Sequence, residues 1–77
     1  MKKIQILGTG CPKCNQLEEN ARIAVDRAGV QCEIQKISDL KEIMGFGVMI
    51  TPALAIDGEV KVSGKVLSVG EIISLLQ

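Results

Sequence analysis

Two cysteines three positions apart are the residues of this chain best suited to chemistry. Cys11 and Cys14 are separated by Pro12 and Lys13, and they follow a short apolar segment that ends in Gly8-Thr9-Gly10. At the start of a helix, two thiols with this spacing can close into a small disulfide ring and open again. The 77 residues include no His, Trp or Tyr, so most other catalytic chemistries lack their usual groups. If the protein is an enzyme, we therefore expect sulfur chemistry.

The two cysteines are predicted to have different roles. Cys11 falls at or just before the first helical turn, where unpaired backbone N–H groups and the helix dipole favour the thiolate and lower its pKa. Pro12 stiffens the turn, and Lys13 either adds a stabilising positive charge or is simply a solvated side chain. Cys14 lies one turn further along, on the same side and more buried. We predict that Cys11 attacks a substrate disulfide and that Cys14 then attacks the sulfur of Cys11, which resolves the mixed disulfide.

Composition excludes several other classes of function. Nine basic and nine acidic residues cancel, so the chain has no charge pattern for nucleic acid or for an anionic membrane surface. The apolar run near the N-terminus is about four residues long, too short for a signal sequence, and no stretch approaches a transmembrane span. We expect a cytoplasmic monomer. In that compartment a cysteine pair is typically redox-active or metal-binding rather than structural.

Hydrophobic periodicity and breaker residues predict seven elements in the order βαβαββα. The predicted strands cover residues 3–7, 30–35, 53–56 and 60–62, and the predicted helices cover residues 12–28, 40–44 and 69–76. Val30, Cys32 and Ile34 alternate with polar residues, so the second strand is half-buried and Cys32 is a small core residue.

Turn and cap residues predict how these elements connect. Asp57-Gly58 indicates a two-residue hairpin, which makes the third and fourth strands antiparallel. The first helical crossover makes the first two strands parallel. Ser68 and Glu71 form a capping box before the last helix. The sequence thus predicts one α/β domain over residues 1–77, a central four-stranded mixed sheet flanked by three helices on both faces.

The second predicted helix carries apolar residues whose role is ambiguous. Ser38 or Asp39 can cap it, and we assign Leu40, Ile43 and Met44 to its inner face. The residues that follow are apolar too. They either pack around a loop or form a rim near Pro52 that receives a substrate protein; we favour packing for Met44 and the rim for Met49. The residues in question are Met44, Phe46, Val48 and Met49.

With these motifs in view, the sequence resembles the thioredoxin and glutaredoxin superfamily, above all its small archaeal and bacterial redox-active disulfide proteins. The resemblance covers essentially the whole chain, and the segments that carry it are residues 8–14, 47–54, 56–58 and 62–65. It implies a thioredoxin-like fold with Cys11 as nucleophile and Cys14 as resolving cysteine. It also implies that Pro52 is a cis-proline beside the disulfide, and that the backbone of Thr51 pairs with the substrate chain. Gly64 would let a substrate backbone approach closely.

The resemblance further implies a thiol–disulfide oxidoreductase with no cofactor beyond a redox-active Cys11–Cys14 disulfide. Its partners would be client protein disulfides and a reductant similar to thioredoxin reductase. Gly10 stands where thioredoxins have Trp, and Lys13 replaces the Tyr between the glutaredoxin cysteines. Ser63-Gly64 does not match the Gly-Gly region of glutaredoxins. These departures favour reduction by a protein dithiol over reduction by glutathione.

Two alternatives to an oxidoreductase remain. The paired thiolates suit linear Cu(I) coordination, which would make the chain a soft-metal-binding module, although small metallochaperones follow a βαββαβ order. A zinc site is not expected, since only Cys32 could add a third thiolate and there is no His. The second alternative is a binding adaptor that kept the fold without the redox chemistry.

Overall fold

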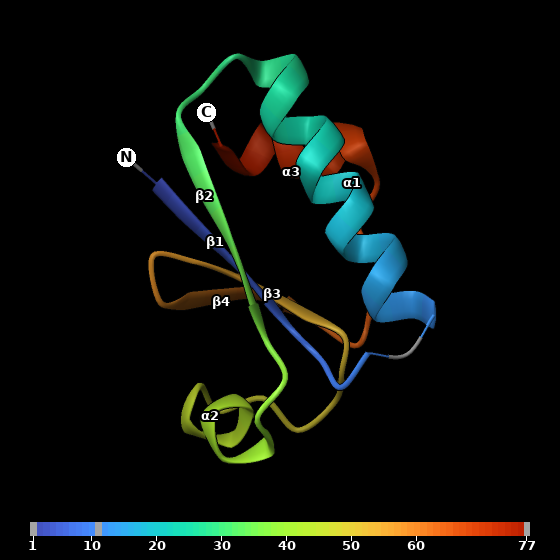
Figure 1. Ribbon diagram of the computed structural model, residues 1–77, viewed down its shortest axis with the longest axis vertical. Helices are drawn as coiled ribbons and strands as arrows, with labels where there is room; N and C mark the ends of the chain where they lie inside the picture. Colours follow the sequence, from blue (N-terminus) through green and yellow to red (C-terminus); the bar gives the residue numbers. More distant parts are fainter. Residues whose placement is uncertain (1, 11, 77) are drawn as a thin grey trace.

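Seven elements follow one another in the predicted βαβαββα order in the computed structural model, which describes residues 2–10 and 12–76 (Figure 1). Predictions that concern Cys11 itself lie outside the described residues. The elements are β1 (Lys2–Leu7), α1 (Pro12–Ala28), β2 (Cys32–Ile37), α2 (Leu40–Gly45), β3 (Ala53–Ile56), β4 (Glu59–Ser63) and α3 (Val69–Leu76). Within the described ranges, no helix combines the length and the apolar character that crossing a membrane requires.

The four strands form one mixed sheet in the order β2-β1-β3-β4. β1 and β2 are parallel, with Leu7 opposite Ile37, while β3 is antiparallel both to β1 and to β4. These orientations confirm the predicted crossover and the predicted hairpin. At the hairpin tip, Asp57 and Gly58 both have positive φ (53° and 85°), and Gly58 N–H donates to Gln5 Oε1 over 2.8 Å. The hairpin is therefore tied directly to β1.

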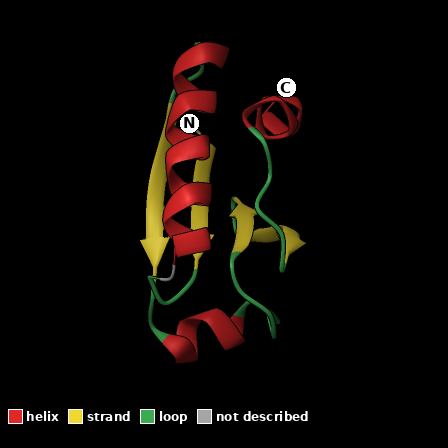
Figure 2. Ribbon diagram, turned by 90° about the vertical axis from the view of Figure 1, so that its right-hand side faces the viewer, coloured by secondary structure: helices red, strands yellow, loops and turns green. Residues whose placement is uncertain are grey.

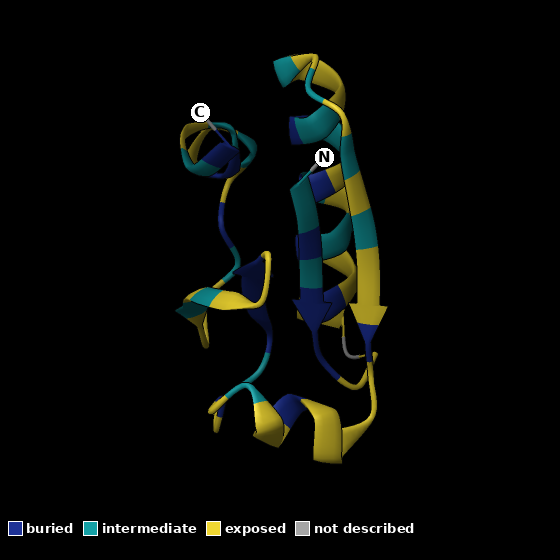
Figure 3. Ribbon diagram, turned by 90° about the vertical axis from the view of Figure 1, so that its left-hand side faces the viewer, coloured by how far each residue is buried: buried dark blue, intermediate teal, exposed yellow. Residues whose placement is uncertain are grey.

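Helices lie on both faces of the sheet, as predicted, because the central strands alternate between two apolar clusters. Ile4 and Leu54 face α1 and α3, which lie on the same side of the sheet (Figure 2). Leu7 and Ala53 face the other way and pack with Ile43 of α2. All four residues of β3 are buried as a result, and the ends of β1 and β2 lead toward α2 (Figure 3).

Two local signals in the sequence are confirmed at atomic detail. Glu71 N–H donates to Ser68 Oγ over 3.2 Å, and Ser68 N–H donates to Glu71 Oε1 over 3.1 Å, which is the reciprocal capping box. Asp39 caps α2, since its Oδ1 accepts from Lys41 N–H over 2.8 Å.

Two expectations about the elements are wrong in detail. β2 begins at Cys32 and ends at Ile37, two residues later than expected at each end, because it pairs with β1 from Lys2 to Leu7. The inner face assigned to α2 is correct only for Ile43. Leu40 and Met44 are 62% and 65% exposed. The short helix lies at the end of the sheet, so the sheet covers only part of its surface (Figure 3).

A charge network fastens the start of α1 to β2. Glu18 Oε2 accepts from Arg22 Nη2 over 2.9 Å, and Glu18 Oε1 lies 3.5 Å from Lys36 Nζ on β2. The hydrogen bond from Arg22 is the main cause that lowers the pKa of the Glu18 carboxyl.

A lowered pKa makes the contribution of Glu18 to stability depend on pH. The contribution is present above the carboxyl's unfolded pKa and is lost as pH falls through its folded value. We expect the free energy of unfolding to be about 0.5 kcal/mol lower in Glu18→Gln at pH 7, with the difference vanishing in acid. Urea unfolding of both proteins across pH 2–7 checks this. A difference that persists unchanged at the acid end would contradict it.

Candidate active site

The segment that carries the cysteines joins the end of β1 to the start of α1. Pro12 and Lys13 are exposed at the first turn of the helix, whereas Cys14 is 0% exposed. The structure therefore confirms that Cys14 is buried, while its predicted position relative to Cys11 lies outside the described residues. Leu17 and Ala21, further along the same face, are fully buried in the main core and fix the helix against the sheet.

The sulfur of Cys14 lies against Gly8, the residue that follows β1. A Cβ built on Gly8 would collide with Cys14 Sγ and would lie 3.0 Å from Cys14 Cβ. Gly8 is buried, and its N–H donates to Ile37 O over 3.0 Å, so its backbone continues the sheet. Sequence reasoning took Gly8-Thr9-Gly10 as a strand break and missed this contact. The available signal was a glycine placed between a strand and the cysteine pair.

The second part of the site is the loop that enters β3. The Thr51–Pro52 peptide bond is cis, as the resemblance implied, and Pro52 is buried. Because Leu7 is paired with Ala53, the residues just beyond this pair, Gly8 and Pro52, belong to the same end of the sheet. The structure thus brings the cis-proline and the segment before the cysteines together.

Gly64 lies next to this loop. A substrate backbone was expected to approach it, but its close neighbour in the structure is Ile50. The N–H of Gly64 donates to Pro52 O over 2.8 Å, which joins the end of β4 to the cis-proline. Its φ is +74°, and a Cβ there would lie 2.9 Å from Cγ2 of Ile50. The close approach that the glycine permits is therefore made by Ile50 of the same chain. Contact between Gly64 and a substrate stays a prediction.

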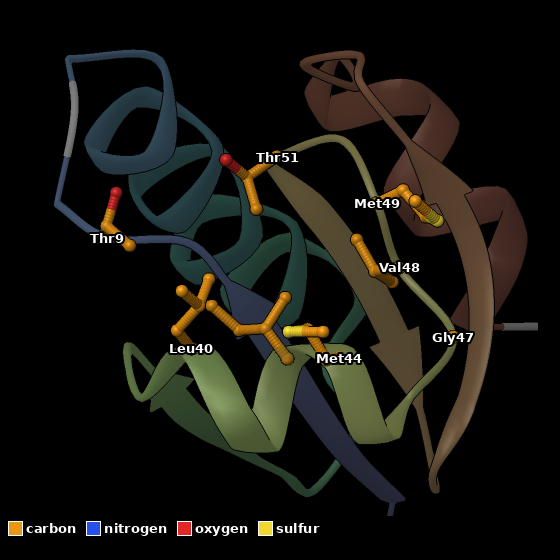
Figure 4. A pocket seen from close by; sticks show the side chains of 8 residues that line it. Thr9, Leu40, Met44, Gly47, Val48, Met49 and Thr51 are labelled. Atoms are coloured by element: carbon orange, nitrogen blue, oxygen red, sulfur yellow. The ribbon is translucent and has the colours of Figure 1, made fainter.

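A pocket of about 430 Å³ opens beside these loops (Figure 4). It lies between the loop after β1, helix α2 and the loop before β3, and none of the described residues that line it is charged. The lining residues are Thr9, Leu40, Ile43, Met44, Gly47, Val48, Met49 and Thr51.

The pocket corrects one expectation about the apolar residues near Pro52. Met44 is an exposed lining residue, so the packing role favoured for it is wrong. Met49 is 94% exposed, which agrees with a place on the rim. Val48 belongs to the apolar cluster that contains Leu7, Ala53 and Ile43, and Phe46 packs against this cluster. A surface with these exposed apolar side chains is well suited to contact another polypeptide.

Cys32 lies far from the end of the sheet where Gly8 contacts Cys14. It is opposite Lys2 in β2, five strand residues from the Leu7 end of β1, or about 16 Å at 3.3 Å per residue. It packs half-buried against the main core, as predicted, and its Sγ donates to Glu33 O over 3.7 Å. Burial raises the pKa of its thiol. Among residues 2–10 and 12–76, no group of three or more His, Cys, Asp or Glu side chains could hold a metal ion.

A raised pKa and a position remote from Cys14 predict that Cys32 takes no part in the chemistry. We expect Cys32→Ala to keep the wild-type rate of disulfide reduction to within about twofold. We also expect iodoacetamide to modify Cys32 more slowly than an unstructured cysteine at pH 7.5, because less of it is thiolate. Mass spectrometry of timed alkylation checks the rate. Loss of activity in Cys32→Ala would show that the third thiol is needed.

This sheet order, with a buried cysteine in the first turn of α1 and a cis-proline at the same end of the sheet, is the arrangement of a thioredoxin-like α/β protein. Comparison with known families agrees, since the family model of the thioredoxin domain matches residues 2–77. The chain belongs to the thioredoxin family.

Two curated relatives are both named thioredoxin. A thioredoxin of Methanothermobacter thermautotrophicus strain Delta H is 47% identical over 76 residues, which cover 99% of each chain. A thioredoxin of Methanocaldococcus jannaschii is 47% identical over 72 residues, which cover 94% of this chain and 83% of that protein. These findings confirm the resemblance to small thioredoxin-like proteins. They do not support the Cu(I)-binding alternative.

Proposed function

We propose that this protein is a thiol–disulfide oxidoreductase that reduces disulfides in client proteins, with Cys11 as nucleophile and Cys14 as resolving cysteine. The observation that carries the proposal is the fully buried position of Cys14 in the first turn of α1, at the end of the sheet where the cis-proline also lies. The family and the names of the two relatives point in the same direction.

The proposed reaction proceeds in two exchange steps. The Cys11 thiolate attacks one sulfur of the client disulfide, the client S–S bond breaks, and the released client sulfur leaves as a thiolate that takes up a proton. The Cys14 thiol then loses its proton and attacks the Cys11 sulfur, which breaks the mixed disulfide and releases the second client thiolate. The client gains two electrons, and the Cys11–Cys14 pair is left as a disulfide.

A reductant must return the disulfide to the dithiol after each turnover. A protein dithiol of the thioredoxin-reductase kind is the proposed donor, and no separate cofactor is required on this chain. The absence of net charge at pH 7 fits a cytoplasmic carrier that meets many clients without strong electrostatic preference. The pair itself would be the electron carrier.

The pocket beside Thr9 and Thr51 is the proposed contact surface for the client chain. Thr9 lies two residues before Cys11 and Thr51 lies directly before Pro52, so a polypeptide bound to Cys11 passes this surface. The uncharged lining and the exposed Met49 favour apolar client side chains next to the attacked cysteine. Thr51 would add a backbone contact, as the resemblance implies.

Insulin reduction with dithiothreitol as electron donor tests the proposed function. The wild type should accelerate precipitation of the insulin B chain well above the dithiothreitol background, and Cys11→Ser should remove the acceleration. Cys32→Ala is the matched control, because it also removes one thiol and leaves the pair intact. A wild type no faster than the background, or a fully active Cys11→Ser, would reject the proposal.

A charge placed in the pocket should weaken client binding without changing the sulfur chemistry. We expect Met44→Glu to raise KM for insulin about tenfold, because a carboxylate must lose water against an apolar partner. Its rate with a small disulfide such as cystamine should stay within about twofold. Gln31→Glu, an exposed position away from the pocket lining, is the control. Equal losses with both substrates would mean that the pocket does not bind the client.

A further inference from the structure

We propose that Gly8 is a positioning residue for the resolving thiol: the missing side chain leaves the space that the sulfur of Cys14 occupies at the end of β1. The inference rests on the proposed function, because it assigns Gly8 a part in the second exchange step. It concerns the position of the Cys14 sulfur relative to the sheet.

Space, and not backbone conformation, is what requires glycine at this position. Gly10, Gly47 and Gly64 have φ values of 92°, 82° and 74°, in the left-handed region that other residues rarely adopt. Gly8 is not in that region, so an alanine there could adopt the same backbone. What alanine cannot do is avoid Cys14, because its methyl group would collide with the sulfur.

The backbone on either side of this contact is held in place. The N–H of Gly8 is bonded to Ile37 O, and the preceding Leu7 is paired with Ile37 on one side and Ala53 on the other. On the helix side, Leu17 is fully buried in the main core and holds α1 in place. A methyl group on residue 8 is therefore accommodated by displacement of the Cys14 side chain.

A displaced sulfur affects the second exchange step and leaves the first intact. In that step Cys14 loses a proton and its sulfur bonds to Cys11, while the Cys11–client bond breaks and the client leaves as a thiolate. Ring closure of this kind needs the attacking sulfur in line with the bond that breaks. The first step makes and breaks bonds only at the sulfurs of Cys11 and the client, so we expect displacement of Cys14 to change its rate little.

Both steps can be followed in one stopped-flow experiment with Ellman's disulfide in a Cys32→Ala background. Attack by Cys11 releases one coloured thiolate in a phase that depends on reagent concentration, and resolution by Cys14 releases a second in a phase that does not. We expect Gly8→Ala to keep the first phase within twofold and to slow the second at least tenfold. If the slower step reflects a tenfold smaller equilibrium constant for closing the Cys11–Cys14 disulfide, the midpoint potential of this pair rises by about 30 mV.

Two further variants separate positioning from general destabilisation. Gly70→Ala is the matched control, because Gly70 is exposed in α3 and a Cβ there meets nothing within 4 Å; both phases should be unchanged. Gly8→Ala combined with Cys14→Ala removes the sulfur that the methyl group would meet. The double variant keeps the Cβ of residue 14, which would lie 3.0 Å from the added methyl group, so a small loss remains. We expect its free energy of unfolding to lie much closer to that of Cys14→Ala alone than to that of Gly8→Ala, even if Gly8→Ala by itself does not fold.

The outcomes distinguish this inference from the proposed function. A normal second phase and potential in Gly8→Ala overturn the inference, and so does a double variant that remains as unstable as Gly8→Ala. A wild type without any second phase, or without a reversible disulfide, overturns the proposed function whatever the Gly8 variants do.

Discussion

Replacing Cys14 with Ser should turn the protein into a trap for its clients. Cys11 keeps its nucleophilic thiolate and still forms the mixed disulfide, but a serine hydroxyl cannot displace the client from the Cys11 sulfur. Turnover of insulin should fall to the dithiothreitol background, while a covalent protein–insulin adduct accumulates. Non-reducing electrophoresis and mass spectrometry measure the adduct, which should disappear on full reduction.

The two cysteines should give different defects, and this difference tests their assigned roles. Cys11→Ser should lose turnover as completely as Cys14→Ser but should form no adduct. Of its two remaining thiols, Cys14 is fully buried, and Cys32 is half-buried with a pKa that burial raises. Cys32→Ala should show neither defect. Adducts formed by Cys11→Ser in place of Cys14→Ser would reverse the two roles, and rapid turnover by Cys14→Ser would remove the need for a resolving thiol.

Leu54→Ala should strongly destabilise the folded protein. Leu54 is 0% exposed in β3, a central strand, and packs in the cluster beneath α1 and α3. Truncation of a fully buried leucine typically costs 2–5 kcal/mol, or about 3 kcal/mol here. A domain of this length has a free energy of unfolding of about 4–12 kcal/mol, so the loss removes a large part of it.

Urea unfolding followed by circular dichroism measures this loss. Leu40→Ala is the matched control, because it makes the same chemical change at a side chain that is 62% exposed. We expect its effect on the free energy of unfolding to stay below about 0.5 kcal/mol. Similar losses for the two variants would mean that the cluster beneath α1 and α3 is not the main source of stability.

Elements specified by their own residues were predictable from the sequence. The capping box of Ser68 and Glu71 and the Asp57-Gly58 hairpin depend on contacts within a few residues, and both form as expected. β3 was also predicted with its observed bounds, because its unbroken apolar run is typical of a strand covered on both faces.

Features set by distant partners were not predictable in the same way. The bounds of β2 depend on its register with β1, and the exposure of Leu40 and Met44 depends on where α2 lies relative to the sheet. Periodicity reports that a helix has an apolar side, but it does not report which of those residues another element covers.

In the site, too, local features were predictable from the sequence and features that depend on distant partners were not. The Cys11–Cys14 spacing and its place between a strand and a helix are visible in the sequence, whereas the cis bond before Pro52 came from the resemblance and not from any local pattern. The contact between Gly8 and Cys14 needs the end of β1 and the first turn of α1 placed together in space. A glycine in a loop has many possible reasons, and the sequence alone does not separate them.

The central claim is a reversible disulfide between Cys11 and Cys14, and peptide mapping tests it most directly. Trypsin cuts after Lys13, so the three cysteines fall on separate peptides, residues 4–13, 14–22 and 28–36. After mild oxidation, we expect peptides 4–13 and 14–22 to be linked, the link to open with dithiothreitol, and peptide 28–36 to stay unlinked. An oxidised protein in which the first two peptides remain separate, or in which peptide 28–36 carries the link, would contradict the account.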